Sequence, residues 1–273
     1  MDAHSAFATV CFGFFGLLFG SFATAAAHRL KPRIPSDTSE VVAQSLATDR
    51  SRCPRCGKVI SWYDNIPVVS YLILRGRCRN CGQKISIRYP IIELVTALLF
   101  AGAAWRYGLT LHAAVYAGLF WTLVVLTAID IDTHKLPSRI IYPAFAVAVV
   151  GFVAVAAIDD NLGRLPKAGI GALMFGGFLF IVAFVYPAGM GLGDVRLGFL
   201  LGLFLGYQGG PGLTGTGMFL SFLLGGVGGV VTLVARKGDR KTALAFGPYL
   251  ALGTVVAIFV GQRLLDAYLN LMS

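Results

Sequence analysis

Apolar residues occur along this chain in long runs that are separated by shorter polar segments. Most runs approach the 20 or so residues that an α-helix needs to cross a bilayer, and few of their positions carry a charge. The predicted spans are 6–27, 91–105, 111–129, 140–158, 168–186, 195–206, 213–235 and 246–265. The pattern therefore predicts an all-α polytopic membrane protein with about eight transmembrane helices.

Lys and Arg residues are distributed unevenly between the loops that this pattern defines. Four segments hold nineteen of the 23 Lys and Arg residues: 28–90, 130–139, 188–196 and 236–245. Cytoplasmic loops of membrane proteins carry an excess of Lys and Arg, so these segments are expected inside and the N-terminus outside. The hydrophobic fraction of 56% and the charged fraction of 13% also argue against a soluble globular domain.

The longest polar segment divides the chain into three regions. Residues 1–27 contain the first transmembrane helix, residues 28–90 form a basic cytoplasmic loop, and residues 91–273 form a membrane-embedded region. Within the loop, the part before residue 53 contains two prolines and no clear periodicity, which is typical of a linker. Residues 53–81 form a small polar module.

Four cysteines in that module form two C-x-x-C pairs: Cys53, Cys56, Cys78 and Cys81. This spacing is typical of sites in which four thiolates hold one zinc ion in a tetrahedron. The reducing cytoplasm favours zinc over disulfides, and a pair of redox dithiols is the alternative. Because four thiolates leave no position for water, we expect a structural zinc that folds the module. A basic zinc ribbon could also bind nucleic acid, but beside apolar spans positive charge more often retains a loop in the cytoplasm.

Carboxylates at the ends of apolar runs are the candidate functional groups. Asp194 follows a turn with glycines at 189, 191 and 193, which let the backbone adopt positive φ and let another group approach closely. A charge inside a membrane helix costs roughly 2.5–3.5 kcal/mol on insertion scales and so indicates function. Asp130 and Asp132 end the third span on the same predicted face. We expect Asp130 to meet Asp194, because Asp132 points about 200° away and lies in the turn.

Two carboxylates at one membrane face suit an aspartyl protease, in which one deprotonates water and the other donates to the scissile carbonyl. Because like charges repel, the pair is expected to share a proton. The helix dipoles predict Asp194 as the base and Asp130 as the acid. Alternatives are ion pairs with Arg196 or Lys135, and a cation or proton relay in a transporter whose zinc module is a cap. His134 and Lys135 are expected to be interfacial anchors.

Several motifs together resemble those of type IV prepilin peptidases, a family of bifunctional membrane leader peptidases and N-methyltransferases. The resemblance rests on Gly20-Ser21-Phe22, the two cysteine pairs, residues 62–67, 74–78 and 86–90, Glu93, residues 130–137, Gly191-x-Gly193-Asp194 and Phe246-Gly247-Pro248. The chain has Ser138 and Thr24 where the family often has aspartate and asparagine.

The resemblance implies that Asp130 and Asp194 catalyse cleavage of a basic leader from type IV prepilins or pseudopilins at the cytoplasmic face. It also implies N-methylation of the new N-terminal residue with S-adenosylmethionine. No residue is assigned to that cofactor, because the chain lacks a glycine-rich βαβ fingerprint. The expected location is the bacterial inner membrane, with prepilins and the lipid bilayer as partners and no nucleic acid.

Overall fold

The computed structural model describes residues 3–30, 53, 55–187, 189–235 and 245–272. These residues are largely α-helical and contain no strand, apart from an isolated bridge between Arg77 and Lys84. Seven of the described helical elements are long and apolar enough to cross a membrane. The prediction of an all-α polytopic membrane protein is therefore confirmed. The predicted linker up to residue 52 and the loop after residue 235 fall mostly outside the described residues.

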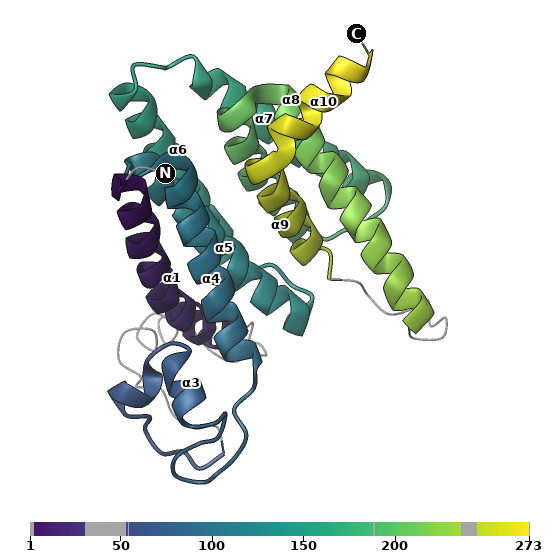
Figure 1. Ribbon diagram of the computed structural model, residues 1–273. Helices are drawn as coiled ribbons and strands as arrows, with labels where there is room; N and C mark the ends of the chain where they lie inside the picture. The colour runs from purple at the N-terminus through teal and green to yellow at the C-terminus, as the bar shows by residue number, and fades with distance from the viewer. Residues whose placement is uncertain (1–2, 31–52, 54, 188, 236–244, 273) are drawn as a thin grey trace. The chain divides into compact units, whose positions relative to one another are not determined.

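The chain divides into two compact units, residues 1–128 and 129–273. The helical elements of the first unit are α1 (Ala3–Arg29), η1 (Trp62–Asn65), α3 (Val69–Ile73), α4 (Arg88–Tyr107) and α5 (Leu111–Thr133), whose last turn belongs to the second unit. Helices α1 and α4 pack side by side, and the cysteine module with η1 and α3 is inserted between them in the chain (Figure 1).

Glycines of α1 allow this helix to approach α4 closely. A Cβ on Gly16 would lie 2.6 Å from Ala97 Cα, and one on Gly20 would lie 2.6 Å from Glu93 Cα. Close backbone approach is the usual way in which membrane helices gain packing energy, since lipid is as apolar as their side chains. The Gly20-Ser21-Phe22 motif is therefore the part of α1 that packs on Glu93 of α4.

The helical elements of the second unit are α6 (Ser138–Ile158), α7 (Arg164–Val185), α8 (Leu192–Ala235), α9 (Gly247–Val256), the π-helical turn η2 (Ala257–Gly261) and α10 (Gln262–Met272). The last three form one continuous candidate span. Helix α8 packs against α7 along one side and against α9 along another.

Helix α8 combines two of the predicted spans in one element. Its 44 residues correspond to about 66 Å of helix, roughly twice the thickness of a bilayer hydrocarbon core. The chain changes direction at Gly210, with φ +69° and ψ −160°, directly before Pro211. Glycine reaches this conformation without steric cost, and proline then starts the next helical segment. The two halves correspond to the predicted spans 195–206 and 213–235, so the seven elements provide about eight spans.

The first half of α8 packs on α7 through glycines that recur every four residues, at 198, 202 and 206. A Cβ on Gly202 would lie 2.2 Å from the carbonyl oxygen of Gly171, and one on Gly206 would lie 2.4 Å from that of Lys167. Side chains at these positions would push the two backbones apart. The contact therefore fixes the half of α8 whose first turn carries Asp194.

Candidate functional site

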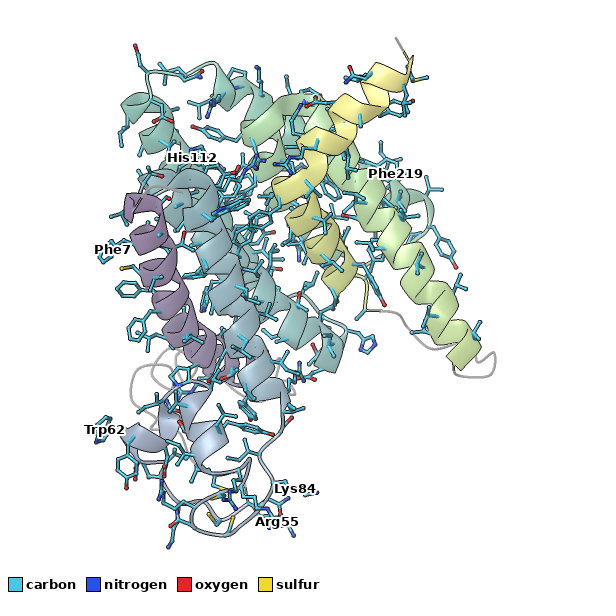
Figure 2. The ribbon with its side chains drawn as sticks, viewed as in Figure 1. Phe7, Arg55, Trp62, Lys84, His112 and Phe219 are labelled. Atoms are coloured by element: carbon cyan, nitrogen blue, oxygen red, sulfur yellow. The ribbon has the colours of Figure 1, made fainter. Side chains whose placement is uncertain are left out.

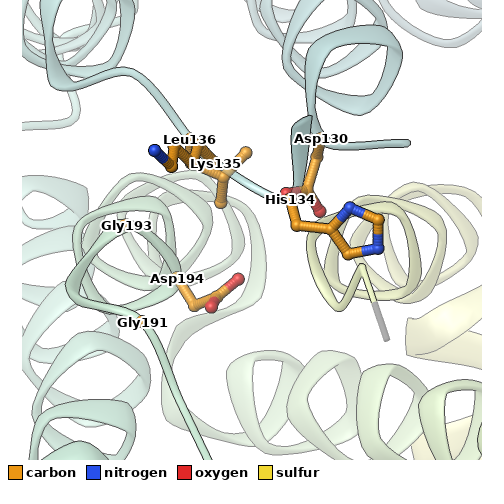
Figure 3. A pocket seen from close by; sticks show the side chains of 7 residues that line it. All are labelled: Asp130, His134, Lys135, Leu136, Gly191, Gly193 and Asp194. Atoms are coloured by element: carbon orange, nitrogen blue, oxygen red, sulfur yellow. The ribbon is translucent and has the colours of Figure 1, made fainter. Parts of the chain in front are cut away.

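Asp130 and Asp194 line one pocket in the second unit, with a cavity volume of about 280 Å³. Figure 3 shows the two carboxylates at this pocket, one from the end of α5 and the other from the start of α8. Asp130 is 4% exposed, and Asp194 is partly exposed. At about 30 Å³ per water molecule, the pocket has room for several waters. The other residues that line it are His134, Lys135, Leu136, Gly191 and Gly193.

The loop that follows α5 positions Asp194. A Cβ on Gly193 would lie 2.9 Å from Leu136 Cβ, so glycine lets this loop close on the first turn of α8. The backbone N–H of Asp194 donates to the carbonyl of Gly191 at 3.1 Å. The expectation of close approach is confirmed at Gly193. The turn does not use the positive φ that these glycines allow, because the described glycines with positive φ are at 57, 76, 82, 108 and 210.

A backbone amide from α9 positions Asp130. The N–H of Gly247 donates to Asp130 Oδ2 at 3.0 Å, although the two residues are 117 positions apart. A Cβ on Gly247 would lie 2.7 Å from the same oxygen, so a larger residue would displace the carboxylate. Gly247 starts α9, and Pro248 occupies its first turn. Our reasoning from the residues missed Gly247, although a Gly-Pro pair opening an apolar helix indicates an N-terminus with free amides.

Two residues predicted as interfacial anchors line the pocket. His134 has φ +53°, and its N–H donates to the carbonyl of Asp130 at 2.8 Å, which ends α5. This reversal brings His134 and Lys135 beside the carboxylates (Figure 3). Asp132 is exposed, and it lies in the last helical turn of α5 and not in the following turn, where we expected it.

The side chain of Arg196 contacts the start of α6. Its Nη1 donates to Ser138 Oγ at 2.5 Å, and its guanidinium lies 5.8 Å from the ring centre of Tyr142. Both partners belong to the start of α6. Arg196 therefore connects the start of α6 to α8, which favours a structural role over the alternative ion pair with the aspartate.

The four cysteines of the module converge on one point. Their Sγ atoms lie within 4.8 Å of one another, and those of Cys53 and Cys81 are 3.9 Å apart. Sulfurs at the corners of a tetrahedron with bonds of about 2.3 Å to zinc are about 3.8 Å apart. The donor set and its spacing therefore fit a tetrahedral thiolate-bound metal ion.

The backbone prepares both cysteine pairs in the same way. The N–H of Gly57 donates to the carbonyl of Cys53 at 2.9 Å, and the N–H of Gly82 donates to that of Cys78 at 2.9 Å. Both glycines have positive φ, +69° and +68°, which lets each loop reverse tightly around its sulfurs. Backbone amides of the first loop lower the pKa of the Cys53 thiol to about 6. A thiolate, the form that binds metal, is therefore favoured at Cys53, whereas burial and the neighbouring thiols raise the pKa of Cys81 to about 11.

Known proteins similar to this chain point to the same family as the aspartate pocket and the cysteine module do. A model of the bacterial peptidase A24 N-terminal domain matches residues 14–107, and a model of the type IV leader peptidase family matches residues 117–234. A prepilin leader peptidase/N-methyltransferase of Pseudomonas aeruginosa is 34% identical, over 99% of this chain and 96% of that protein. The chain belongs to the type IV leader peptidase family. Within the family, the relative from Bacillus subtilis is 30% identical over 94% of this chain and 96% of its own length.

The family matches cover both parts of the candidate site. The first contains the cysteine module and Glu93, and the second contains Asp130 and Asp194. A relative from Pseudomonas putida, also a prepilin leader peptidase/N-methyltransferase, is 36% identical over 94% of this chain and 92% of its own length. No solved structure matches the chain. The resemblance inferred from the motifs is therefore confirmed, and the protein is a multi-pass membrane member of this family.

Proposed function

We propose that this protein is a membrane aspartyl endopeptidase that removes the basic leader from type IV prepilins or pseudopilins. The observation that carries the proposal is the position of Asp130 and Asp194, which come from distant parts of the sequence and line one pocket. The activity named for its relatives supports the same function. Neither the fold nor the comparisons favour the transporter alternative.

The pocket supplies the parts that peptide hydrolysis needs. One carboxylate, in its ionised form, takes a proton from a water molecule in the pocket as that water attacks the scissile carbonyl carbon. The other carboxylate, in its protonated form, donates a hydrogen bond to the carbonyl oxygen. Because two carboxylates in one pocket repel when both are ionised, the resting pair holds one proton.

The structure changes the argument for which aspartate is the base. Asp194 lies in the first turn of α8, where the helix dipole favours its charge, as we predicted. Asp130 lies at the end of α5 but also accepts the first N–H of α9, and that contact favours its charge too. The helix ends therefore no longer separate the two residues, and we assign the shared proton to the pair.

We place the pocket at the cytoplasmic face of the bacterial inner membrane. Nineteen of the 23 Lys and Arg residues lie in the segments that this orientation puts inside, including those that contain the two aspartates. A prepilin has a hydrophobic segment that would lie among the membrane helices. Its basic leader would remain inside by the same charge rule, beside the pocket.

We also assign one structural zinc ion to Cys53, Cys56, Cys78 and Cys81, and S-adenosylmethionine as the methyl donor for the second activity named for the relatives. A bound zinc would contribute to folding a module too small for a hydrophobic core of its own. Metal analysis of the purified protein should find one zinc per chain. Cys81→Ser should lower that content, and the loop between α1 and α4 should become sensitive to protease.

Mass spectrometry of a prepilin incubated with the purified protein and S-adenosylmethionine tests both activities separately. We expect leader removal followed by a mass gain of one methyl group. Asp130→Asn and Asp194→Asn should each abolish cleavage, whereas Asp132→Asn, on an exposed carboxylate outside the pocket, should retain it. Unchanged cleavage by either of the first two variants would contradict the proposal.

A further inference from the structure

The cysteine module carries exposed apolar side chains that neither its zinc site nor the peptidase pocket explains. Trp62 in η1 is 80% exposed, and Val69, Leu72 and Ile73 in α3 are 47%, 68% and 69% exposed. The three residues of α3 have the i, i+3, i+4 spacing that places them on one side of a helix. Helices η1 and α3 contact each other. We call these four residues the η1–α3 face.

A hydrogen bond attaches the start of α3 to a candidate membrane span. The N–H of Val68, the residue before α3, donates to Glu93 Oε2 at 2.8 Å. Glu93 lies five residues after the start of α4 at Arg88, which is about 7.5 Å along the helix axis. Helix α4 is a candidate membrane span from that first residue. The hydrogen bond therefore attaches the start of α3 to the second turn of a candidate membrane span.

The backbone before α3 adopts a strained conformation that the surrounding contacts hold in place. Val68 has φ +60° and ψ −48°, and the N–H of Val69 donates to the carbonyl of Pro67 at 2.6 Å, which is a γ-turn. Positive φ is sterically unfavourable for a β-branched residue such as valine. The acceptor Glu93 is itself 8% exposed, with Gly20 of α1 packed on its Cα. The position of α3 against α4 is thus built into the fold.

The charged end of the module lies away from these apolar residues. Figure 2 shows Arg55 and Lys84 at the end of the module distant from α4, while Trp62 projects from its side. Arg75, two residues after α3, is exposed. Apolar side chains on one part of a segment and cationic residues on another are typical of elements that lie in a membrane interface, where tryptophan is also enriched.

We propose that the η1–α3 face is inserted in the bilayer at the boundary between headgroups and acyl chains. The zinc module is then a cap seated on the membrane surface and not a loop surrounded by water. An inserted depth of about 5–10 Å is typical of interfacial elements, and the Val68–Glu93 hydrogen bond holds the start of α3 against the first turns of α4, where such an interface is expected. The proposal needs only the membrane spans, so it does not depend on the peptidase assignment.

Tryptophan fluorescence of the full-length protein in lipid nanodiscs tests this insertion. The intensity of the wild type minus that of Trp62→Phe isolates Trp62, because Trp105 and Trp121 are present in both proteins. Acyl chains brominated near the headgroup should quench most of the Trp62 signal, and chains brominated near the terminal methyl should quench it less. Aqueous acrylamide should quench it weakly. Strong acrylamide quenching, or no quenching by either reagent, would show a face in water or one covered by protein, and either result overturns the proposal.

A pair of charge insertions provides a second measurement. The double variant Leu72→Asp/Ile73→Asp should lose the quenching of Trp62 by brominated lipid and gain quenching by acrylamide, because two carboxylates exclude the face from the acyl region. Val59→Asp is the matched control, since Val59 is 39% exposed in the same module but outside the face. Zinc content measured on each variant reports whether the module is folded. Unchanged lipid quenching in the zinc-loaded double variant would contradict the insertion.

Discussion

Glu93 in the first unit and Asp130 in the second are two buried carboxylates held in similar ways. They are 8% and 4% exposed, and each accepts one backbone N–H from the residue that precedes or starts a helix. The donor to Glu93 is Val68 at 2.8 Å, and the donor to Asp130 is Gly247 at 3.0 Å. Their surroundings differ, because α1 closes over Glu93 whereas Asp130 lines a pocket that contains a second carboxylate.

The comparison separates what holds a carboxylate in a membrane helix from what makes it reactive. A backbone donor satisfies a buried oxygen in either case and lowers the cost of its burial. Proton transfer also needs space for water and a partner that divides the proton with it. Of the two residues, Asp130 has both, so we assign catalysis to Asp130 and a structural role to Glu93.

The largest difference between the two carboxylates is expected in their effect on prepilin cleavage. Asp130→Asn should lower prepilin cleavage by about 10²–10⁴-fold or more, because the amide cannot transfer the proton. Glu93→Gln should retain cleavage within about threefold per folded molecule, because the amide oxygen still accepts the Val68 N–H. Cleavage rates on a purified prepilin measure both. Equal losses in the two variants would remove the distinction between the sites.

The next effect concerns the donor to Asp130. Gly247→Ala should lower kcat by about 10²-fold with a small change in KM, since its Cβ would displace the carboxylate from its reactive position. Gly226→Ala is the control, because a Cβ there meets no atom within 4 Å. Steady-state kinetics on both variants distinguish misplacement of Asp130 from general damage to the helices. A fully active Gly247→Ala enzyme would show that the amide of Gly247 is not needed.

The structural role of Glu93 predicts an effect on stability. Glu93→Ala should destabilise the protein by about 1–3 kcal/mol, because it leaves the Val68 N–H without its acceptor. Glu93→Gln should lower the free energy of unfolding by less than Glu93→Ala does. Unfolding of the detergent-solubilised variants, followed by circular dichroism, gives the order. Equal stability of the alanine variant and the wild type would contradict the role of this hydrogen bond.

The smallest effect on stability is expected at Val68, in the γ-turn, whose N–H donates to Glu93. Val68→Gly should leave stability unchanged or raise it by up to about 1 kcal/mol, because glycine adopts positive φ without strain. Val69→Gly, one position later inside α3, should instead lower stability by about 1 kcal/mol. The same unfolding measurement checks both variants. A larger loss at Val68 than at Val69 would show that its side chain matters more than its conformation.

The sequence by itself determined the parts that depend on composition and local spacing. Apolar run lengths predict the spans, because each helix must satisfy its own backbone in lipid. The C-x-x-C spacing predicts the cysteine cluster, since each pair is only four residues long. The glycines of α8 predict a close helix contact, although not that α7 is the partner. Asp130 and Asp194 were identifiable as costly charges at the ends of apolar runs.

Only the tertiary structure decided which groups surround those charges. The hydrogen bond from Gly247 to Asp130 joins residues 117 positions apart, and the one from Val68 to Glu93 joins residues 25 positions apart. The sequence pattern shows that a face is apolar but does not show which helix covers it. The reversal at His134, which brings that side chain to the pocket, depends on how the following loop packs on α8. Long-range packing therefore determines which of the buried carboxylates has a pocket and a partner.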